Sequence, residues 1–278
     1  MDFAPAAAEA LAALTASLNP AQRAAVSAPP EHRLVLAGAG SGKTRVLTHR
    51  VAWLIAAEGV SPHSILAVTF TNKAAAEMRG RLQQLLAIAV RTLWVGTFHG
   101  IAHRMLRLHW QDARLPQNFQ ILDADDQQRL VKRVARGLEL AEDKFAPRIL
   151  TGWINNQKEE GLRPQHLQDQ GDLTQRQFVR VYTAYQQQCE ANGLVDFAEL
   201  LLRAFELCRD HKEIQTHYRQ RLRHLLVDEF QDTNTLQYQW LRVIAGDSGK
   251  LFAVGVLELV HQQMPQALPV MCLDLLMV

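Results

Sequence analysis

The chain has 278 residues, enough for one large or two modest domains, and 48% of them are hydrophobic, as expected of a protein with a packed core. Its formal net charge of +2 at pH 7 excludes a strong global basic field, so a nucleic-acid site would have to be local. The three cysteines, Cys189, Cys208 and Cys272, lie far apart without C-x-x-C spacing. This argues against a zinc site or a disulfide framework and favours a reducing compartment.

The first 18 residues are rich in alanine, but they contain Asp2 and Glu9 and lack the basic leader of a signal peptide. No uninterrupted apolar run along the chain reaches membrane-spanning length. We therefore expect a cytoplasmic protein with no membrane partner.

Residues 37–44 form the most informative stretch, because a glycine-rich turn there follows the apolar run 34–36 and precedes a helical pattern that starts near Arg45. A strand, such a turn and a helix direct successive backbone N–H groups onto one anion. Lys43 adds a point charge for the outer phosphates, and Thr44 offers a hydroxyl to Mg²⁺. The predicted triphosphate-binding residues are Ala37, Gly38, Ala39, Gly40, Ser41, Gly42, Lys43 and Thr44.

Ala37 occupies the first position of the usual G-x-x-x-x-G-K-[ST] pattern, a departure that leaves little bulk near the phosphates. The ordinary alternative is a glycine-rich turn with a surface lysine. The strand and the helix that flank the turn both argue against it. The stretch therefore predicts a site for a nucleoside triphosphate.

Three strand–helix units precede residue 110. The apolar stripe over residues 46–55 predicts a helix after the first strand. Strands are then expected at 65–70 and 93–97, each followed by a helix, the first over about 73–86 and the second running through 110. Strands alternating with helices predict an α/β fold with a P-loop, RecA-like parallel sheet.

The pattern changes between residues 114 and 193, where Gln, Arg and Glu are frequent and helices are expected almost throughout. Residues 175–191 read as a long amphipathic helix ended by an Asn-Gly pair. The α/β character returns with the helices 197–209 and 235–245 and the strands 225–227 and 251–254. These changes predict an all-helical insertion and the following boundaries: 1–110 and 196–255 for the two parts of the α/β lobe, 111–195 for the insertion and 256–278 for an atypical apolar tail.

An acidic pair, Asp228 and Glu229, follows the predicted strand 225–227. The carboxyl end of a strand in an open α/β sheet faces the crevice where ligands bind. In P-loop enzymes the first acid holds Mg²⁺ and a neighbouring carboxylate orients or deprotonates the attacking water. We assign these roles to Asp228 and Glu229, with Lys43 as a second catalytic residue. Alone, such a pair is usually a solvated sheet edge, but the upstream phosphate loop favours the functional interpretation.

Further motifs carry a family resemblance. The segment 18–22, which reads Leu-Asn-Pro-Ala-Gln, resembles the adenine-sensing element of UvrD/Rep/PcrA-type superfamily 1 DNA helicases, and residues 40–47 are also similar to that family. The resemblance implies that Gln22 hydrogen-bonds the adenine edge and that Arg45 stacks on the base. Residues 193–197 and 228–232 complete the likeness, which extends from residue 18 to 255.

The same resemblance implies contacts with single-stranded DNA at residues 68–78 and 96–99, from Phe70, Asn72, Thr97, Phe98 and His99. Each segment begins at the end of a predicted strand, where aromatic faces could stack on bases without regard to sequence. The alternative is that Phe70 and Phe98 are core aromatics and that His99 caps a helix. The residues taken alone favour this alternative, whereas the family resemblance favours contact with DNA.

The likeness ends after Gly255, where the family continues into a second lobe that carries a γ-phosphate sensor and arginine fingers. Residues 256–278 contain no Lys or Arg and three Met, so we expect a frameshift or premature stop near residue 255. The resemblance implies the ATP-binding lobe of an ATP-dependent 3′→5′ DNA helicase of repair or replication, with Mg²⁺, ATP and single-stranded DNA as ligands. A complementing lobe or a full-length helicase would be a further partner.

Three alternatives stay open at this point. The chain could be part of a RecB/AddA-type helicase–nuclease, a module that binds ATP and single-stranded DNA without turnover, or a remnant fragment. Salt-dependent DNA binding would mark the binding module. For each phosphate of a single strand that the protein neutralises, the logarithm of the binding constant falls by about 0.7 per tenfold increase in salt concentration.

Overall fold

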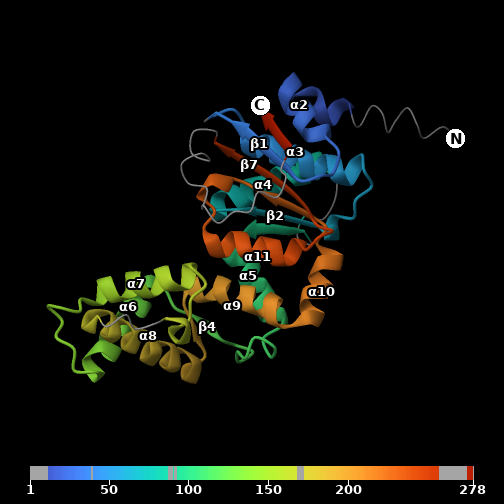
Figure 1. Cartoon of the computed structure of the whole chain (residues 1–278). Coiled ribbons are helices and arrows are strands. Elements are labelled where there is room, and N and C mark those ends of the chain that lie inside the picture. Colours follow the sequence, from blue (N-terminus) through green and yellow to red (C-terminus); the bar gives the residue numbers. More distant parts are fainter. Residues whose placement is uncertain are drawn as a thin grey trace. The chain divides into compact units, whose positions relative to one another are not determined.

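The computed structural model describes residues 12–38, 40–86, 90, 93–167, 172–256 and 274–277, the last four by their backbone alone. The chain divides into two compact units (Figure 1). Unit 1 comprises residues 1–101, 213–233 and 241–278, and unit 2 comprises residues 102–212 and 234–240. The boundaries expected at residues 110, 195 and 255 remain a prediction.

Unit 1 is built on a parallel sheet with the strand order β3-β2-β6-β7-β1-β8. In this register Val35 lies opposite Val254, and Val68 lies opposite Val227. The predicted fold class, an α/β fold with a parallel sheet flanked by helices, is confirmed. The strands are β1 (Arg33–Ala37), β2 (Ile65–Thr69), β3 (Trp94–Thr97), β6 (His224–Val227), β7 (Lys250–Val256) and β8 (Asp274–Met277).

The helices α2 (Pro20–Ser27), α3 (Lys43–Ala56), α4 (Asn72–Leu85) and α10 (Lys212–Arg221) belong wholly or almost wholly to unit 1. Local caps explain where α2 and α4 begin. Asn19 and Gln22 form a capping box at the start of α2, where Pro20 already has the helical φ. The Thr71 hydroxyl accepts from the Ala74 N–H at 3.1 Å and starts α4.

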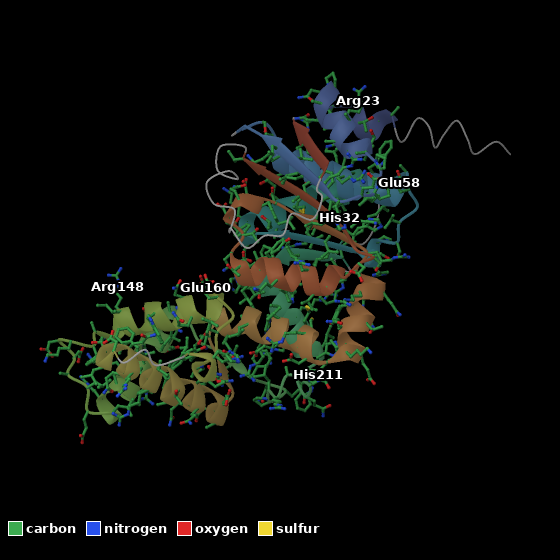
Figure 2. The ribbon with its side chains drawn as sticks, in the orientation of Figure 1. Arg23, His32, Glu58, Arg148, Glu160 and His211 are labelled. Carbon is green, nitrogen blue, oxygen red and sulfur yellow. The ribbon has the colours of Figure 1, made fainter. Side chains whose placement is uncertain are left out.

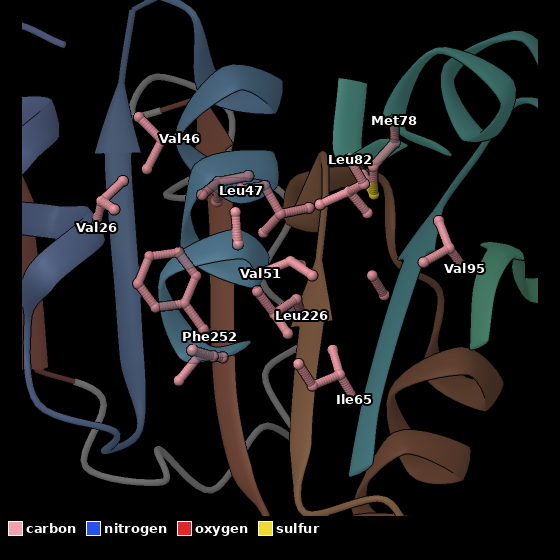
Figure 3. Packing of buried hydrophobic residues seen from close by; sticks show 14 of the residues in the cluster. Val26, Val46, Leu47, Val51, Ile65, Met78, Leu82, Val95, Leu226 and Phe252 are labelled. Atoms are coloured by element: carbon pink, nitrogen blue, oxygen red, sulfur yellow. The ribbon is translucent and has the colours of Figure 1, made fainter. Parts of the chain in front are cut away.

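Apolar side chains cover both faces of this sheet. On one face, Val46 and Val51 of α3 and Met78 of α4 belong to a single buried cluster with Leu226 and Phe252 of the strands (Figure 3). On the other face, the fully buried Trp94 ring meets the Tyr218 ring of α10 edge-on, with 5.7 Å between centroids. Strands buried on both sides read as continuous apolar runs, which is why they were visible in the sequence.

Unit 2 is mainly helical. Its core is shared by three helices and contains Leu130, Val131, Leu150, Ile154 and Tyr185. Short strands pair in parallel, with Ile121 opposite Val195. The elements are α6 (Ala124–Gly137), α7 (Pro147–Glu159), α8 (Leu173–Asn192), α9 (Phe197–Asp210), β4 (Gln120–Ile121) and β5 (Leu194–Val195), while α5 (Phe98–Leu108) and α11 (Thr235–Ala245) contribute residues to both units.

Gly193 ends α8 as expected from the Asn-Gly signal. It adopts a left-handed conformation with φ +62°, and its N–H bonds back to the carbonyls of Cys189 and Glu190. A Cβ at this position would lie 2.5 Å from Cγ of Pro116. Both the dihedral angle and the close approach therefore require glycine.

Helix α7 is amphipathic, with one exception. Leu150 and Ile154 face the core, whereas Arg148 and Glu160, near its two ends, carry exposed side chains (Figure 2). Lys158 breaks the pattern, because it is charged and yet 0% exposed. A buried ammonium needs charged partners to remain ionised.

A buried ionic cluster supplies those partners. Lys158 Nζ lies 2.6 Å from Asp196 Oδ2 and 2.9 Å from Glu199 Oε2, and Arg163 contacts the same Glu199 oxygen at 2.7 Å. The Tyr185 hydroxyl donates to Asp196 at 2.7 Å. Burial by itself would lower the pKa of Lys158, but the two carboxylates outweigh burial and raise it. The cluster joins α7, α8 and α9 into one unit.

Most expected elements are confirmed, including the strands near 34–36, 65–70, 93–97, 225–227 and 251–254 and the helix 235–245. Helix α10 was not expected, because its ten residues carry few apolar side chains. Of the atypical tail, the structure describes the strand β8, whose backbone pairs with β1, while residues 257–273 and 278 lie outside the described residues.

Among the residues that the structure describes, no helix combines the length and the apolar character needed to cross a membrane.

Replacing Lys158 by Ala should lower the free energy of unfolding by about 3–5 kcal/mol, because the Asp196 and Glu199 carboxylates would stay buried without their cation. Urea denaturation followed by tryptophan fluorescence measures the loss. Lys132→Ala is the matched control, since it removes a lysine from an exposed pair with Glu142 and should cost far less. Equal losses in the two variants would contradict a structural role for the buried cluster.

Candidate functional site

The glycine-rich turn follows β1 directly and leads into α3. Gly40 and Gly42 have φ angles of +74° and +86°, a region that side chains with a Cβ rarely adopt. No atom lies within 4 Å of the position that a Cβ would take at Gly38 or Gly40, so the inside of the turn is open. Ala37 is the last residue of β1, and Ala39 lies outside the described residues.

The start of α3 lacks the side-chain cap that begins α2, α4, α6, α8 and α9. Its N-cap is Gly42, and no side chain in the described part of the chain accepts from the first-turn N–H groups. These donors, with the positive end of the helix dipole, attract an anion. Lys43 opens the helix and is 8% exposed, while Ser41 Oγ is buried with no partner among the described residues. The turn therefore fits a phosphate group.

Gln22 ties α2 to this turn. Its Oε1 accepts from the Asn19 N–H at 3.1 Å, and its Nε2 donates to the Ser41 carbonyl at 2.9 Å. Arg50 of α3 anchors the other end of α2, donating to the carbonyls of Val26 at 2.7 Å and Ala28 at 2.5 Å. Burial lowers the pKa of Arg50 to about 10. Sequence reasoning found Gln22 but missed Arg50, which looks like an ordinary exposed helix position.

Arg45, the other residue expected at the base, lies in the first turn of α3. It lines a hollow of about 280 Å³ together with His49, Arg81, Gln84 and Leu85. Arg45 therefore borders an open space. Its stacking role remains a prediction.

One member of the acidic pair, Asp228, contacts the residue that follows Lys43. The Thr44 hydroxyl donates to Asp228 Oδ2 at 3.0 Å, although the two residues are 184 positions apart. Asp228 is 1% exposed at the end of β6. Burial raises the pKa of Asp228 above its ordinary value, and the Thr44 hydrogen bond opposes that effect. A hydroxyl and a carboxylate in contact are the protein ligands that a nucleotide-bound Mg²⁺ uses.

The described residues include no group of three or more His, Cys, Asp or Glu side chains that could hold a metal ion. Mg²⁺ usually binds through one or two carboxylates together with substrate phosphates. Thr44 and Asp228 suit that arrangement.

Glu229 has an unusual backbone. Its φ of +47° and ψ of +51° place it in the left-handed region, which costs a non-glycine residue about 1–3 kcal/mol. Gln231 Nε2 donates to Glu229 Oε2 at 2.7 Å, and Gln231 Oε1 accepts from the Val256 N–H at 3.1 Å. Sequence reasoning included Gln231 within a motif but gave it no role, because only folding brings Val256 to it.

The predicted DNA-binding residues lie at the ends of β2 and β3, which are neighbouring strands. Phe70 is half-buried and Asn72 is exposed at the start of α4. The Phe98 ring is 1% exposed and meets Phe70 edge-on, with 5.5 Å between centroids. In this geometry Phe70 presents accessible ring surface and Phe98 supports it from below. The Thr97 hydroxyl accepts from the Gly100 N–H at 3.1 Å, so it caps the start of α5.

His99 follows Phe98 in the first turn of α5 and is partly buried. Burial lowers the pKa of its imidazole, which favours the neutral form of the ring. A neutral ring suits hydrogen bonding or stacking better than charge pairing with phosphate. Its contact with DNA remains a prediction, as do those of Phe70, Asn72, Thr97 and Phe98.

A sequence model described as the UvrD/REP helicase N-terminal domain matches residues 18–256, most of the chain and both halves of the site. The chain belongs to this family. The match confirms the predicted resemblance to UvrD/Rep/PcrA-type helicases.

Several relatives of the chain are named DNA helicases. It is 58% identical over 239 residues to DNA helicase II of Escherichia coli. The matched region covers 86% of this chain and 33% of the relative. It is 54% identical over 242 residues to DNA helicase II of Haemophilus influenzae. It is 42% identical over 244 residues to ATP-dependent DNA helicase PcrA of Leuconostoc citreum, with 87% and 33% coverage. The chain thus spans about a third of the length of these relatives.

Asp228→Asn should raise the melting temperature of the protein without nucleotide. Because the pKa of Asp228 is higher in the folded than in the unfolded protein, its ionised form lowers the free energy of unfolding at neutral pH. That deficit disappears as pH falls through the raised pKa. Asn keeps an acceptor for Thr44 and carries no charge. Calorimetry at pH 7 measures the change, and Asp143→Asn, at an exposed residue, is the control with no expected shift. A lower melting temperature for Asp228→Asn alone would contradict this interpretation.

Proposed function

We propose that this chain is the Mg·ATP-binding lobe of a 3′→5′ DNA helicase and that it also binds single-stranded DNA. The 3.0 Å contact between Thr44 and Asp228 is the observation that carries the proposal, since it joins the phosphate turn and the acidic pair in one site. Family membership and the names of the relatives support DNA as the second ligand. The 3′→5′ direction rests on the family resemblance alone.

The proposed chemistry is hydrolysis of the bond between the β- and γ-phosphates. The N–H groups at the start of α3 and the Lys43 ammonium would hold the phosphates, and Thr44 and Asp228 would hold Mg²⁺, which neutralises charge on the phosphate oxygens. Glu229 would accept a proton from the water that attacks the γ-phosphorus, while the bond to ADP breaks. Gln22 and Arg45 would recognise the base.

The proposed DNA site is the strand ends that carry Phe70, Asn72, Thr97, Phe98 and His99. They follow β2 and β3, and β2 also pairs with the strand that leads to Asp228. A sheet edge shared by both sites could couple ATP hydrolysis to DNA contact. Repair or replication, the pathway expected for the whole protein, belongs to the same proposal, as does a cytoplasmic location.

Lys43→Ala and Asp228→Ala should each weaken Mg²⁺-dependent binding of a fluorescent ATP analogue by about 10- to 150-fold, since each removes a charged contact worth about 1.5–3 kcal/mol. Titration with and without EDTA measures the binding and its metal dependence. Lys212→Ala, which removes an exposed lysine, is the matched control and should bind as the parent does. The nucleotide proposal fails if the parent, folded by circular dichroism, shows no saturable binding.

Phe70→Ala should lower the affinity for an oligo(dT) strand by about 5- to 150-fold, which corresponds to a stacking loss of about 1–3 kcal/mol per base. Fluorescence anisotropy at several salt concentrations gives the affinity and the number of phosphates neutralised. Phe197→Ala removes another partly exposed aromatic ring, 56% exposed on α9, and serves as the matched control. Equal losses in both variants would show that Phe70 is not a specific stacking platform. Binding of both ligands without hydrolysis would favour the non-catalytic module.

A further inference from the structure

The side chain of Gln231 is hydrogen-bonded to Glu229, to Asp232 and to the backbone of Val256. Its Nε2 donates to Glu229 Oε2 at 2.7 Å and to Asp232 Oδ2 at 3.3 Å, and its Oε1 accepts from the Val256 N–H at 3.1 Å. Gln231 is 9% exposed, so water has little access to its amide. Its amide donors are directed at Glu229 and Asp232, and its amide oxygen is directed at the end of β7.

The identity of the partners determines the orientation of the amide. The NH₂ group faces two carboxylates, which accept only, and the carbonyl faces a backbone N–H, which donates only. The reversed amide would place its oxygen against both carboxylates and its donors against an N–H. Gln231 therefore acts as a polar bridge with one allowed orientation.

The carboxylate of Glu229 depends on this bridge. Its backbone is left-handed, so the side chain leaves the main chain in a direction that ordinary residues do not adopt. Within the described part of the chain, Gln231 is the side chain to which the Glu229 carboxylate is hydrogen-bonded. The other end of the bridge is the Val256 amide, which belongs to β7, the strand between β6 and β1.

We propose that Gln231 is a positioning residue that aims the Glu229 carboxylate and makes its position depend on the end of β7. This inference rests on the proposed role of Glu229 in ATP hydrolysis. Gln231 does not touch the reacting atoms in this scheme. It selects the rotamer of Glu229 and holds it while Thr44 and Asp228, which contact each other independently, keep their own geometry. A change at the C-terminal end of β7 would then reach Glu229 through one side chain.

Two substitutions separate the ends of the bridge. Gln231→Glu has the same shape and keeps an acceptor for the Val256 N–H, but it loses the donor to Glu229 and adds a carboxylate beside two others. Gln231→Leu removes both contacts without adding charge. Gln188→Glu, at an exposed position of α8, is the matched control for the change in charge.

The decisive measurement is NMR of the full chain without nucleotide, with ¹³C-labelled glutamate. Gln231→Leu should shift the backbone and carboxyl ¹³C signals of Glu229, and Gln231→Glu should shift the carboxyl signal, while Gln188→Glu leaves both unchanged. Unchanged Glu229 signals in both Gln231 variants would overturn the proposal. If Gln231→Leu does not fold, as judged by circular dichroism, the isosteric Gln231→Glu decides.

A second readout distinguishes positioning from general damage. Gln231→Leu should bind the fluorescent ATP analogue within about threefold of the parent, because the groups proposed to hold phosphate and Mg²⁺ are untouched, and single-turnover hydrolysis should fall by at least about tenfold. A parallel loss of affinity in Gln231→Leu would overturn the positioning role. Failure of the parent to bind nucleotide would overturn the proposed function instead, while the NMR comparison would still decide whether Gln231 aims Glu229.

Discussion

The contact between the Thr44 hydroxyl and Asp228 is the constraint on which the rest of the site depends. It is a hydrogen bond of 3.0 Å between residues 184 positions apart, and it exists only if β1 and β6 hold their places in one parallel sheet. The strand β7 lies between them. Because apolar side chains cover both faces of this sheet, the strand order is stable enough to place two polar groups within bonding distance.

Local strain is concentrated around this contact. Gly40 and Gly42 have positive φ without cost, whereas Glu229 has it at a cost that a hydrogen bond from Gln231 helps to offset. Burial of the Asp228 carboxyl, which raises its pKa, also costs stability, because the ionised form is less stable there than a neutral group would be. Under the proposed function such costs are expected, because bound phosphate and Mg²⁺ would offset them.

Unit 2 shows a different solution to the burial of charge. Lys158 and Glu199 are almost completely inaccessible, and each is paired with more than one opposite charge. Such a cluster adds little net stability compared with apolar packing, but it strongly disfavours any arrangement of α7 and α9 that separates the partners. The UvrD/REP family match covers this cluster together with the phosphate turn. The chain therefore combines a packed sheet with a helical unit that is held in register by charge.

The sequence alone determined the fold class and the family, and it marked the glycine-rich turn and the acidic pair as candidate site residues, because each of these is written in short contiguous segments with strong local signals. The strands are continuous apolar runs, and residues 37–44 contain the glycines that the turn requires. Tertiary structure decided what depends on distant partners: the burial of Phe98 beneath Phe70, the anchoring of α2 by Arg50, and the bridge from Gln231 to Val256. No local pattern marks these, since a side chain's partners across a sheet are set by strand order and register rather than by its neighbours in the chain.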